Sequence, residues 1–300
     1  MYSKKNKMIP PEAPFISRLC VIGVGLIGGS LARALRQSHT VGEVIGAGRR
    51  EEPLRKALEL GVIDRYELGL ERAVAGADMV VVAVPLGAMG AVFAAIAGRL
   101  SPDCVLTDVG SAKGSVVGDV RRIFGETPPS FVPGHPIAGT EKSGVEASFP
   151  DLFRGHKVIL TPLVETDAKA LERVRRMWEL TGAEVVEMGV RHHDEVLAAT
   201  SHLPHMLAFA LVDTLARLDD RAEIFRYAAG GFRDFTRIAS SDPQMWHDIC
   251  LANREQLLVM IDLFCRDLKR LAEAIDQGDS SALMTVFQRA KHARDNLYRE

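Results

Sequence analysis

Short apolar runs rich in valine and isoleucine alternate with longer helical patterns over the first two thirds of the chain. Each run has the length of a strand, and a stretch of helix-forming residues separates it from the next one. Strands that are apolar along their whole length are typical of a parallel sheet covered by helices on both faces. The predicted strands are residues 18–22, 43–46, 79–85, 104–109, 130–132, 157–160 and 183–188.

Helical periodicity replaces the strand pattern after about residue 190. Residues 192–217 and 280–297 each predict a helix, and residues 242–275 predict a longer one. Asp242 and Pro243 suit the start of the long helix, as its cap and its first helical residue. The long helix carries a wide apolar stripe, which must pack against the rest of this domain or against a partner subunit. Its members are Leu257, Met260, Ile261, Phe264, Leu268 and Leu271.

Composition adds little to this picture. The 300 residues are 47% hydrophobic and 25% charged, which is ordinary for a soluble globular protein. The formal net charge is −2 and the basic residues are spread along the chain, so no basic stripe suggests nucleic acid. The apolar runs are shorter than the ~20 residues that span a bilayer, so no membrane segment is expected.

The chain ends and the cysteines favour a cytoplasmic protein. Residues 1–17 hold three lysines and three prolines with no apolar segment after them, so we expect a flexible extension and not a signal peptide. The four cysteines show no C-x-x-C spacing, which suits reduced thiols.

The first apolar run leads into Gly23-x-Gly25-x-x-Gly28 and then a helical stretch, which is the context of a dinucleotide-binding turn. Gly23 permits a tight turn, Gly25 lets the backbone approach a pyrophosphate, and Gly28 lets the helix pack on the strand. Amides at the helix start, with Leu26 and Ile27, would hold the phosphates. The alternative is a tight turn without a ligand. We predict a Rossmann-type doubly wound parallel sheet over residues 18–189. The other expected cofactor contacts are Val84, Pro85 and Ser111.

The second predicted strand bears on the choice of cofactor. Gly48 stands where an NAD enzyme usually places an acid on the adenine ribose. No carboxylate there repels a 2′-phosphate, and Arg49 and Arg50 are available to bind one, so the sequence favours NADP over NAD. The alternative is that the two arginines are a solvated pair and that Glu51 or Glu52 reaches the ribose.

Four segments carry a family resemblance: residues 107–114, 134–144, 201–205 and 230–239, with residues 241–246 just after the last. In this order they resemble the prephenate/arogenate dehydrogenases over nearly the whole chain from Arg18. The resemblance implies hydride transfer to NAD(P) from a cyclohexadienol that carries a ring carboxylate, followed by loss of CO2, in tyrosine biosynthesis. It also implies an all-α C-terminal domain at residues 190–300 that binds substrate and forms a homodimer.

His135 is the candidate base for the ring hydroxyl. It follows the predicted strand at 130–132, whose carboxyl end would face the cofactor crevice, and imidazole titrates near neutral pH. The plainer alternative is a histidine that only hydrogen-bonds a loop. The resemblance gives Ser111 the task of orienting His135 and the nicotinamide, although a serine there also suits a helix cap.

Arg237 is the candidate clamp for the ring carboxylate, because guanidinium and carboxylate can pair through two hydrogen bonds. Arg233 is its rival, and Asp234 could pair with either. The alternative is a cluster of surface ion pairs, which would contribute little. Only the family pattern favours Arg237.

The resemblance places His205 near the substrate side chain and Ser201 and His202 in the pocket wall. Further pocket candidates are Thr140, Glu141 and Trp246; the alternatives for Trp246 are that the partner subunit supplies it or that it is part of the core. His202 and His205 share a helix face with Asp194 or Glu195 two turns back, so a metal site is an alternative. We expect no metal, since hydride transfer to a nicotinamide needs none.

Two other functions are compatible with parts of the sequence. A β-hydroxyacid dehydrogenase would need a lysine early in the helical domain, and none lies between Lys169 and Lys269. A non-catalytic NAD(P) sensor shares the fold but has no need for His135, Ser111 and Arg237. Between the family substrates, we expect prephenate before arogenate, although Glu141 would favour the ammonium of arogenate.

Overall fold

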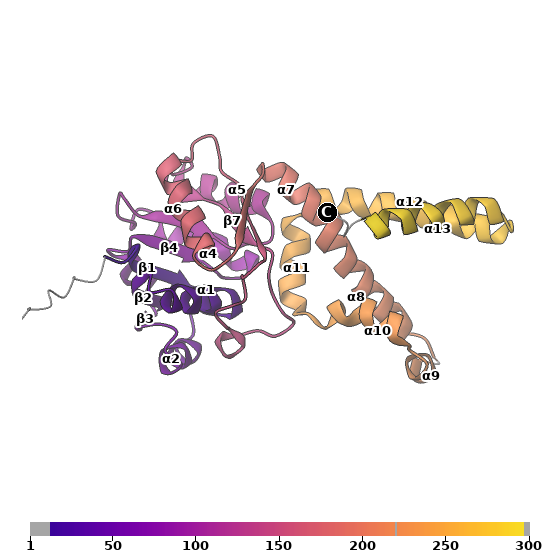
Figure 1. The fold of residues 1–300 in the computed structure, drawn as a ribbon, viewed down its shortest axis with the longest axis horizontal. Coiled ribbons are helices and arrows are strands. Elements are labelled where there is room, and N and C mark those ends of the chain that lie inside the picture. Colours follow the sequence, from indigo (N-terminus) through magenta and orange to yellow (C-terminus); the bar gives the residue numbers. More distant parts are fainter. Residues whose placement is uncertain (1–12, 220, 297–300) are drawn as a thin grey trace, which may run out of the picture.

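The chain folds into an α/β part followed by a helical part, and the two lie side by side along the molecule (Figure 1). The computed structural model describes residues 13–219 and 221–296. The expected parallel sheet is confirmed, with strand order β3-β2-β1-β4-β5-β6. Its strands are β1 (Ile16–Ile22), β2 (Val41–Ala47), β3 (Arg65–Glu67), β4 (Met79–Val82), β5 (Val105–Asp108) and β6 (Phe131–Val132).

The extension expected at residues 1–17 falls mostly on residues 1–12, which lie outside the described residues. Ile16 already belongs to β1, where it lies opposite Val41 of β2. The sheet therefore begins two residues before the predicted start of the α/β domain.

Both faces of the sheet are buried, which explains the continuous apolar runs. Val21 of β1 packs on one face with Leu31, and the next residue, Ile22, packs on the other face with Phe93. The first face is covered by α1 (Leu26–Gln37), α2 (Glu51–Glu59) and α6 (Ala168–Glu179). The second is covered by α3 (Leu70–Val74), α4 (Leu86–Ile96) and α5 (Lys113–Phe124).

The strand order reverses at β1, which lies between β2 and β4. In an open α/β sheet, ligands bind outside the carboxyl ends of the strands at such a reversal. The glycine turn after β1 and the loop after β4 both lie at this edge, as does the loop after β5. The topology therefore brings the predicted cofactor residues together.

The expectation of one parallel sheet through residue 189 was wrong for its last strands. β7 (Gly134–Pro136), β8 (Lys157–Leu160) and β9 (Glu184–Glu187) form a separate sheet, in which β7 runs antiparallel to β8. Pro133 separates β6 from β7, and because proline has no N–H it cannot continue a ladder. His135 consequently lies within a strand, opposite Ile159.

The helical part begins with a continuous helical stretch, as predicted for residues 192–217. Its middle turn is π-helical, which widens the helix just before Pro204. Proline cannot donate a hydrogen bond and crowds the carbonyl four residues earlier, so a widened turn accommodates it. The elements are α7 (Val190–Leu197), η2 (Ala198–His202), α8 (Leu203–Ala216), α9 (Arg221–Arg226), α10 (Gly230–Thr236), η3 (Arg237–Ser240), α11 (Pro243–Ala252), α12 (Arg254–Asp276) and α13 (Ser280–Asn296).

The single long helix predicted at residues 242–275 was wrong, because the structure divides it at Asn253 into α11 and α12. The backbone of Asn253 has φ −110° and ψ 33°, outside the helical region. Its side chain is buried and bonds to α7 and η2. Apolar periodicity carries no information on such a break, because tertiary hydrogen bonds stabilise it.

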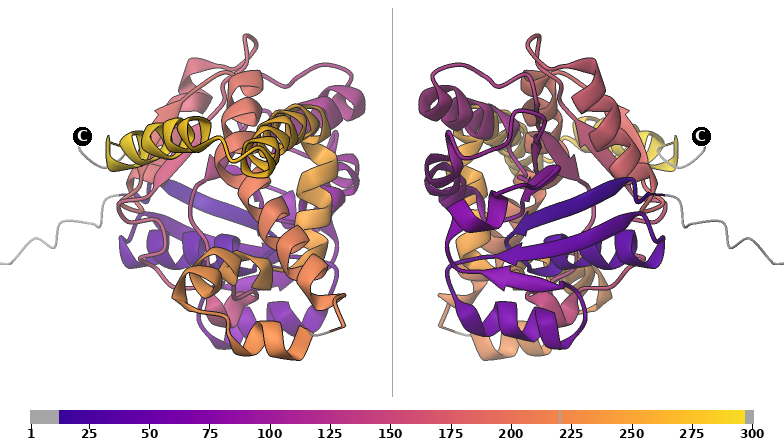
Figure 2. Two further views of the ribbon diagram at one scale, coloured as in Figure 1. Left: turned by 90° about the vertical axis from the view of Figure 1, so that its right-hand side faces the viewer. Right: turned by 90° about the vertical axis from the view of Figure 1, so that its left-hand side faces the viewer.

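The apolar stripe of α12 is only partly covered within one chain. Helices α12 and α13 pack together and project away from the α/β part (Figures 1 and 2). Leu257 is buried, whereas Phe264 and Leu268 are exposed. Among the described residues, nothing within the chain covers the outer half of the stripe.

One helical stretch, Val190–Ala216, is long and apolar enough to span a membrane by length and composition, with a mean hydropathy of 1.2. The expectation that no run of that length exists was therefore too strict. The stretch also carries His193, Asp194 and His202, whose side chains are buried against other elements. We interpret it as a helix of the second domain.

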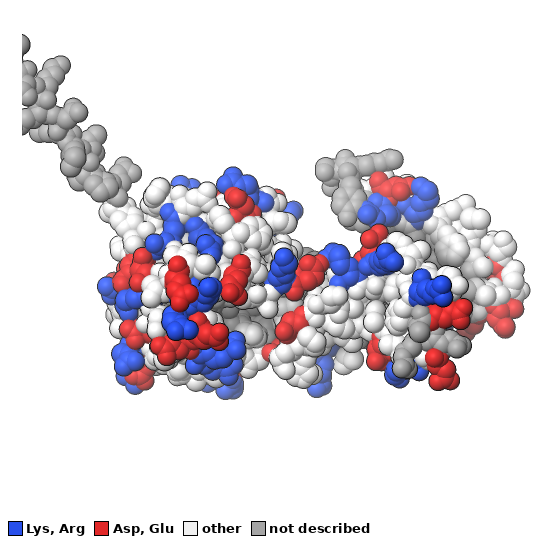
Figure 3. Space-filling view, turned by 90° about the horizontal axis from the view of Figure 1, so that it is seen from below, with Lys and Arg blue, Asp and Glu red and all other residues white. Residues whose placement is uncertain are grey.

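Charged side chains of both signs are intermingled over the face seen from below (Figure 3). Many pair one turn apart on a helix, as Arg191 does with Glu195 at 2.8 Å. Exposed pairs of this kind contribute little to stability. A pair of a different kind, which is buried, lies at the end of β5 and belongs to the site described next.

Candidate active site

The glycine turn between β1 and α1 has the geometry of a phosphate cradle. Gly23 adopts φ +99°, and a Cβ there would lie 2.4 Å from the Ala83 carbonyl oxygen. A Cβ on Gly28 would lie 2.3 Å from the Gly23 oxygen, so the helix could not approach the strand. Helix α1 begins at Leu26, with no side chain capping it and no acid in its first turn. Its first amides, which include that of Ile27, suit an anion.

Space remains open where the cofactor would lie. A Cβ on Gly25 would meet no atom within 4 Å, and one on Gly48 would meet only the Leu54 side chain at 3.8 Å. Arg49 and Arg50 are both exposed beside Gly48. The rival acid Glu51 accepts a hydrogen bond from the Tyr66 hydroxyl at 2.7 Å.

The loop after β4 meets the helical part. Val84 is half-buried and Pro85 is exposed at the start of α4. The Gly87 amide donates to Asp248 of α11 at 3.2 Å. The predicted nicotinamide end of the crevice is thus bounded by both parts of the chain.

A buried ion pair lies at the carboxyl end of β5. Neither Lys113 nor Asp108 is exposed, and the Lys113 ammonium contacts the carboxylate and also donates to the Gly134 carbonyl at 2.6 Å. The Gly110 amide donates to the same carboxylate at 2.7 Å. Burial lowers the pKa of Lys113, and the charge of Asp108 opposes that shift. The pair holds the backbone directly before His135.

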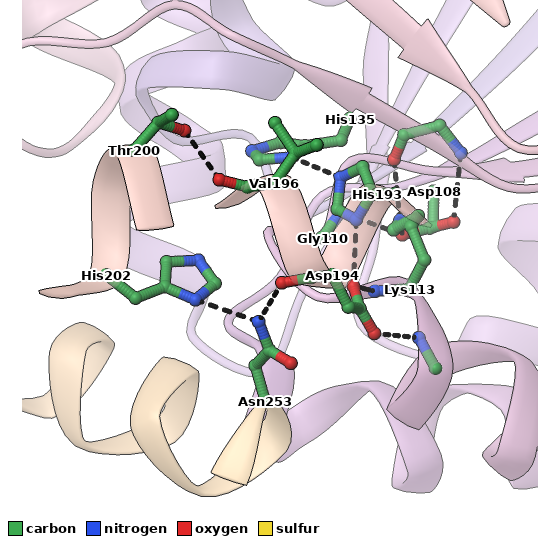
Figure 4. A network of polar contacts seen from close by, with 12 residues as sticks. Asp108, Gly110, Lys113, His135, His193, Asp194, Val196, Thr200, His202 and Asn253 are labelled. Carbon is green, nitrogen blue, oxygen red and sulfur yellow. Dashed lines mark hydrogen bonds and ion pairs between the residues drawn. The ribbon is translucent and has the colours of Figure 1, made fainter. Parts of the chain in front are cut away.

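His135 is buried and contacts another buried histidine that the sequence analysis missed. Its Nδ1 lies 2.9 Å from Nε2 of His193, whose own Nδ1 lies 2.8 Å from the carboxylate of Asp194 (Figure 4). Burial lowers the pKa of His135 well below its usual value, and His193 and Lys113 lower it further. His135 is therefore neutral at physiological pH.

Asp194 also caps α5. The amides of Lys113 and Gly114 each donate to its carboxylate at 2.8 Å. Burial alone would raise the pKa of Asp194, but hydrogen bonds from His193 and from these amides outweigh burial and lower it. The cap considered for Ser111 is thus supplied by α7, Nδ1 of His135 contacts His193, and Ser111 is half-buried.

A second branch leads from Asp194 to the pocket wall. The Asn253 amide donates to the Asp194 carbonyl at 2.8 Å and to Nδ1 of His202 at 3.1 Å. Burial lowers the pKa of His202 to about 4. Its Nε2 is buried and has no partner among the described residues, and the same holds for the indole nitrogen of Trp246. Two polar atoms are therefore buried unpaired in one region.

Trp246 lies against both predicted histidines within the same chain. Its ring stacks on His205 with 3.7 Å between centroids, and it meets the edge of His202 at 6.2 Å. His205 is held by the Ser201 carbonyl, which its Nδ1 contacts at 2.9 Å. Contacts within one chain therefore account for the position of Trp246 beside these histidines. Its supply by the partner subunit stays an untested alternative.

Arg237 forms an ion pair with Glu141, in which the Arg237 side chain is 64% exposed and that of Glu141 is 39% exposed. The pair joins η3 to the loop after β7, which carries Thr140 as well. The Thr140 hydroxyl accepts from the Lys142 amide at 3.2 Å. Arg233, the rival clamp, lies on α10 just before η3 and is exposed.

The metal alternative receives no support from the arrangement. Within residues 13–219 and 221–296, no group of three histidine, cysteine, aspartate or glutamate side chains is placed to hold an ion. The Asp194 carboxylate faces α5 and His193, while His205 stacks on Trp246.

Two family models match the chain in succession. One, described as the nucleotide-binding domain of prephenate dehydrogenase, matches residues 31–187. The other, described as the prephenate dehydrogenase dimerization domain, matches residues 190–289.

Curated relatives match over nearly the full chain. A cyclohexadienyl dehydrogenase from Zymomonas mobilis is 40% identical over 283 residues, which cover 92% of this chain and 94% of the relative. A prephenate dehydrogenase from Bacillus subtilis is 37% identical, over 93% of this chain and 76% of the relative.

Solved structures of prephenate and arogenate dehydrogenases are also similar to this chain. The prephenate dehydrogenase of Aquifex aeolicus, determined with hydroxyphenyl propionate and NAD+, is 41% identical with a TM-score of 0.87, covering 94% of this chain and 98% of that one. The arogenate dehydrogenase of Synechocystis is 27% identical with a TM-score of 0.78, covering 93% and 99%. The similarity includes both the α/β part and the helical part.

Proposed function

The chain belongs to the prephenate dehydrogenase family, and from that membership we propose that it catalyses the oxidative decarboxylation of prephenate to 4-hydroxyphenylpyruvate. The hydroxyl-bearing ring carbon gives up a hydride to the nicotinamide of NAD(P), and loss of CO2 makes the ring aromatic. The product is a precursor of tyrosine. The observation that carries the proposal is the buried, neutral His135, next to Gly134, which the ion pair after β5 holds, in a chain that matches the family along its length.

The glycine turn fits a dinucleotide. Helix α1 begins with free amides and no acid, and the space over Gly25 is open, so this turn would hold the pyrophosphate. We assign the nicotinamide end to the loop that holds Val84 and Pro85, together with Ser111 after β5. In this proposal a cofactor held by these residues would lie with its nicotinamide end toward His135.

NADP is the cofactor we favour over NAD. The space beside Gly48 holds no carboxylate that would repel a 2′-phosphate, and Arg49 and Arg50 lie exposed next to it. Of the two rival acids, Glu51 accepts a hydrogen bond from Tyr66, and Glu52 is exposed, so the preference rests on Arg49 and Arg50. A relative solved with NAD+ belongs to the same family, so the preference has to be measured in this protein.

His135 acts as the base. It takes the proton of the ring hydroxyl as the hydride leaves, and it returns that proton to the phenolic oxygen after CO2 has gone, so no net proton is consumed. Burial keeps the ring neutral and ready to accept. The ion pair of Lys113 with Asp108 holds the preceding carbonyl and so fixes the position of the ring.

Arg237 binds the ring carboxylate. In this structure the Glu141 carboxylate occupies its guanidinium, so the substrate would compete with Glu141 for that cation. We place prephenate before arogenate because two relatives that are 37% and 34% identical are named prephenate dehydrogenase. His205, Trp246, His202, Ser201 and Thr140 would line the rest of the pocket.

The active molecule is a homodimer in this proposal. The second family model describes a dimerization domain, and α12 exposes part of its apolar stripe, including Phe264 and Leu268. A second copy of the helical part would cover these side chains. All four cysteines are free, which fits the cytoplasm.

Steady-state assays that cross prephenate and arogenate with NADP and NAD test the proposal. Prephenate with NADP should give the highest kcat/KM, with stoichiometric 4-hydroxyphenylpyruvate and CO2. Cofactor binding without turnover in any of the four combinations would refute the dehydrogenase and favour an NAD(P) sensor. Higher kcat/KM with arogenate would overturn the substrate assignment alone.

A further inference from the structure

Asp194 contacts two different histidines of the site through two intermediaries. Its carboxylate bonds to the ring of His193, which reaches His135, and its backbone carbonyl bonds to Asn253, which reaches His202 (Figure 4). All five side chains are buried. The first branch runs from Asp194 through His193 to His135, and the second runs from Asp194 through Asn253 to His202. In each branch, the groups that can only accept or only donate decide which atom carries the proton.

The first branch starts at an acceptor. The Asp194 carboxylate receives the Lys113 and Gly114 amides at 2.8 Å, and an ionised carboxylate has no proton to donate. The Nδ1 of His193, 2.8 Å away, must therefore carry the proton of that hydrogen bond. A neutral ring with its proton on Nδ1 has a lone pair on Nε2.

The lone pair of His193 Nε2 sets the state of His135. Nε2 of His193 lies 2.9 Å from Nδ1 of His135, and since the first atom accepts, the second must donate. A neutral His135 with its proton on Nδ1 presents an unprotonated Nε2. That atom is the one left to accept the substrate hydroxyl proton.

The second branch gives the opposite result. A backbone carbonyl only accepts, so the atom of Asn253 that lies 2.8 Å from the Asp194 oxygen is the amide nitrogen. The same nitrogen lies 3.1 Å from Nδ1 of His202, which therefore accepts. A neutral His202 then carries its proton on Nε2, the buried atom that has no partner among the described residues.

We infer that Asp194 anchors two positioning residues, His193 and Asn253, which fix opposite tautomers on the two histidines, so that His135 presents an acceptor and His202 presents a donor. The catalytic consequence rests on the proposed function, whereas the tautomers themselves do not. In the reaction, His135 accepts the hydroxyl proton, and Nε2 of His202 donates to a substrate oxygen.

The surrounding charges keep both rings neutral, as the inference requires. His193, Lys113 and His202 face His135, and burial with these groups lowers its pKa. Asp194, His193 and His205 face His202, whose pKa burial lowers to about 4. Asp108 neutralises much of the Lys113 charge. Above about pH 5 His202 is not expected to hold a second proton, and near neutral pH His135 is not expected to hold one either.

Nitrogen NMR of the histidine side chains in the ligand-free, full-length protein tests the tautomers directly. The chain has nine histidines, which single substitutions can assign. At pH 7, His135 and His193 should show the proton on Nδ1, and His202 should show it on Nε2. A proton on Nε2 of His135, or on Nδ1 of His202, overturns the inference whatever the activity.

Variants of His193 give a kinetic readout. His193→Leu removes the acceptor, so His135 should lose its Nδ1 proton, and kcat should fall by about 10²–10⁴-fold, as when a catalytic histidine adopts the wrong tautomer. His193→Gln offers an amide oxygen at the same place and should restore most of kcat with a normal pH profile. His192→Gln, the exposed neighbour, is the control.

Asn253→Asp tests the second branch separately. A carboxylate cannot donate, so His202 should move its proton to Nδ1 while His135 keeps its own. The variant should raise KM for substrate far more than it lowers affinity for cofactor. If wild-type protein lacks prephenate turnover but shows the expected tautomers, the proposed function fails and the positioning stands. Full activity of His193→Leu with an unchanged His135 signal refutes the positioning.

Discussion

Lys113 and Asp108 form an ion pair in which neither side chain reaches solvent, and the lysine also binds the carbonyl of the residue before His135. A buried charge is costly without its partner, although replacing both charges together can be nearly neutral. The pair thus connects the stability of the α/β part with the position of the candidate base.

Lys113→Met should destabilise the protein by about 3–5 kcal/mol, because it leaves the Asp108 carboxylate buried and unpaired. Urea unfolding at pH 7 measures this. Adding Asp108→Asn should recover part of the loss. Lys157→Met, which breaks the exposed pair with Glu184, is the control and should change the free energy of unfolding far less. Equal effects of the two lysine variants would show that the buried pair is not special.

His135→Asn should lower kcat by about 10³-fold, because the hydroxyl proton loses its acceptor. Cofactor binding, followed by fluorescence titration, should persist, since the glycine turn is untouched. His156→Asn changes an exposed histidine in a turn and serves as the control. Turnover near the wild-type value would refute the assignment of His135 as the base.

Arg237→Gln should raise KM for substrate by about 10²-fold while KM for cofactor changes little, because a paired charge on the ring carboxylate is lost. Arg233→Gln tests the rival residue in the same assay. A larger effect at position 233 would transfer the clamp to α10.

Gly48→Asp should move the preference from NADP toward NAD by about 10²-fold in kcat/KM, through repulsion of the 2′-phosphate. The position has room for the side chain, since the nearest atom to a new Cβ is 3.8 Å away on Leu54. Arg49→Ala should weaken the NADP preference, and Arg55→Ala on the exposed face of α2 should not. An unchanged NADP to NAD ratio in Arg49→Ala contradicts the role of the arginine.

Stability should fall as the pH is lowered from about 6.5 toward 4. Burial lowers the folded-state pKa of His202 from 6.5 to about 4, so between these values the unfolded chain binds more protons and unfolding is favoured. This group alone accounts for roughly 3 kcal/mol, at about 1.4 kcal/mol per pKa unit. Unfolding in urea at pH 7, 6 and 5 measures the slope. His202→Asn should weaken the pH dependence of the free energy of unfolding, and His156→Asn should not. If His202→Asn and the wild-type protein show the same pH dependence, His202 is not its source.

The family and the α/β architecture could be predicted from residues that lie close together in sequence. The apolar runs predicted five of the six parallel strands because burial on both faces leaves a local pattern, and they missed only the short, half-buried β3. Gly23 and Gly28 were identifiable because the turn they form is complete within six residues. His135 and Arg237 came from ordered motifs, and their assigned roles remain predictions.

Other features could not be predicted because their stabilising contacts join distant segments. Asn253, where the predicted helix is divided, donates from its side chain to the Asp194 carbonyl, 59 positions away in sequence. His193 was not singled out within its predicted helix and Asp194 was considered only as a metal ligand, although the adjacent His-Asp pair at the head of that helix is visible in the sequence. Asp108 and Lys113 lie within the family segment 107–114. Their separation of five positions in the sequence does not show that both side chains are buried.

The sequence by itself determined the sheet, the glycine turn and the family, since each follows from periodicity or from a contiguous motif. Only the tertiary structure decided that β7 leaves the main sheet, that α12 begins at Arg254 and that His135 contacts His193. The physical reason is the same in each case. A buried polar group must find a partner, and which partner it finds depends on what the fold brings within hydrogen-bond distance.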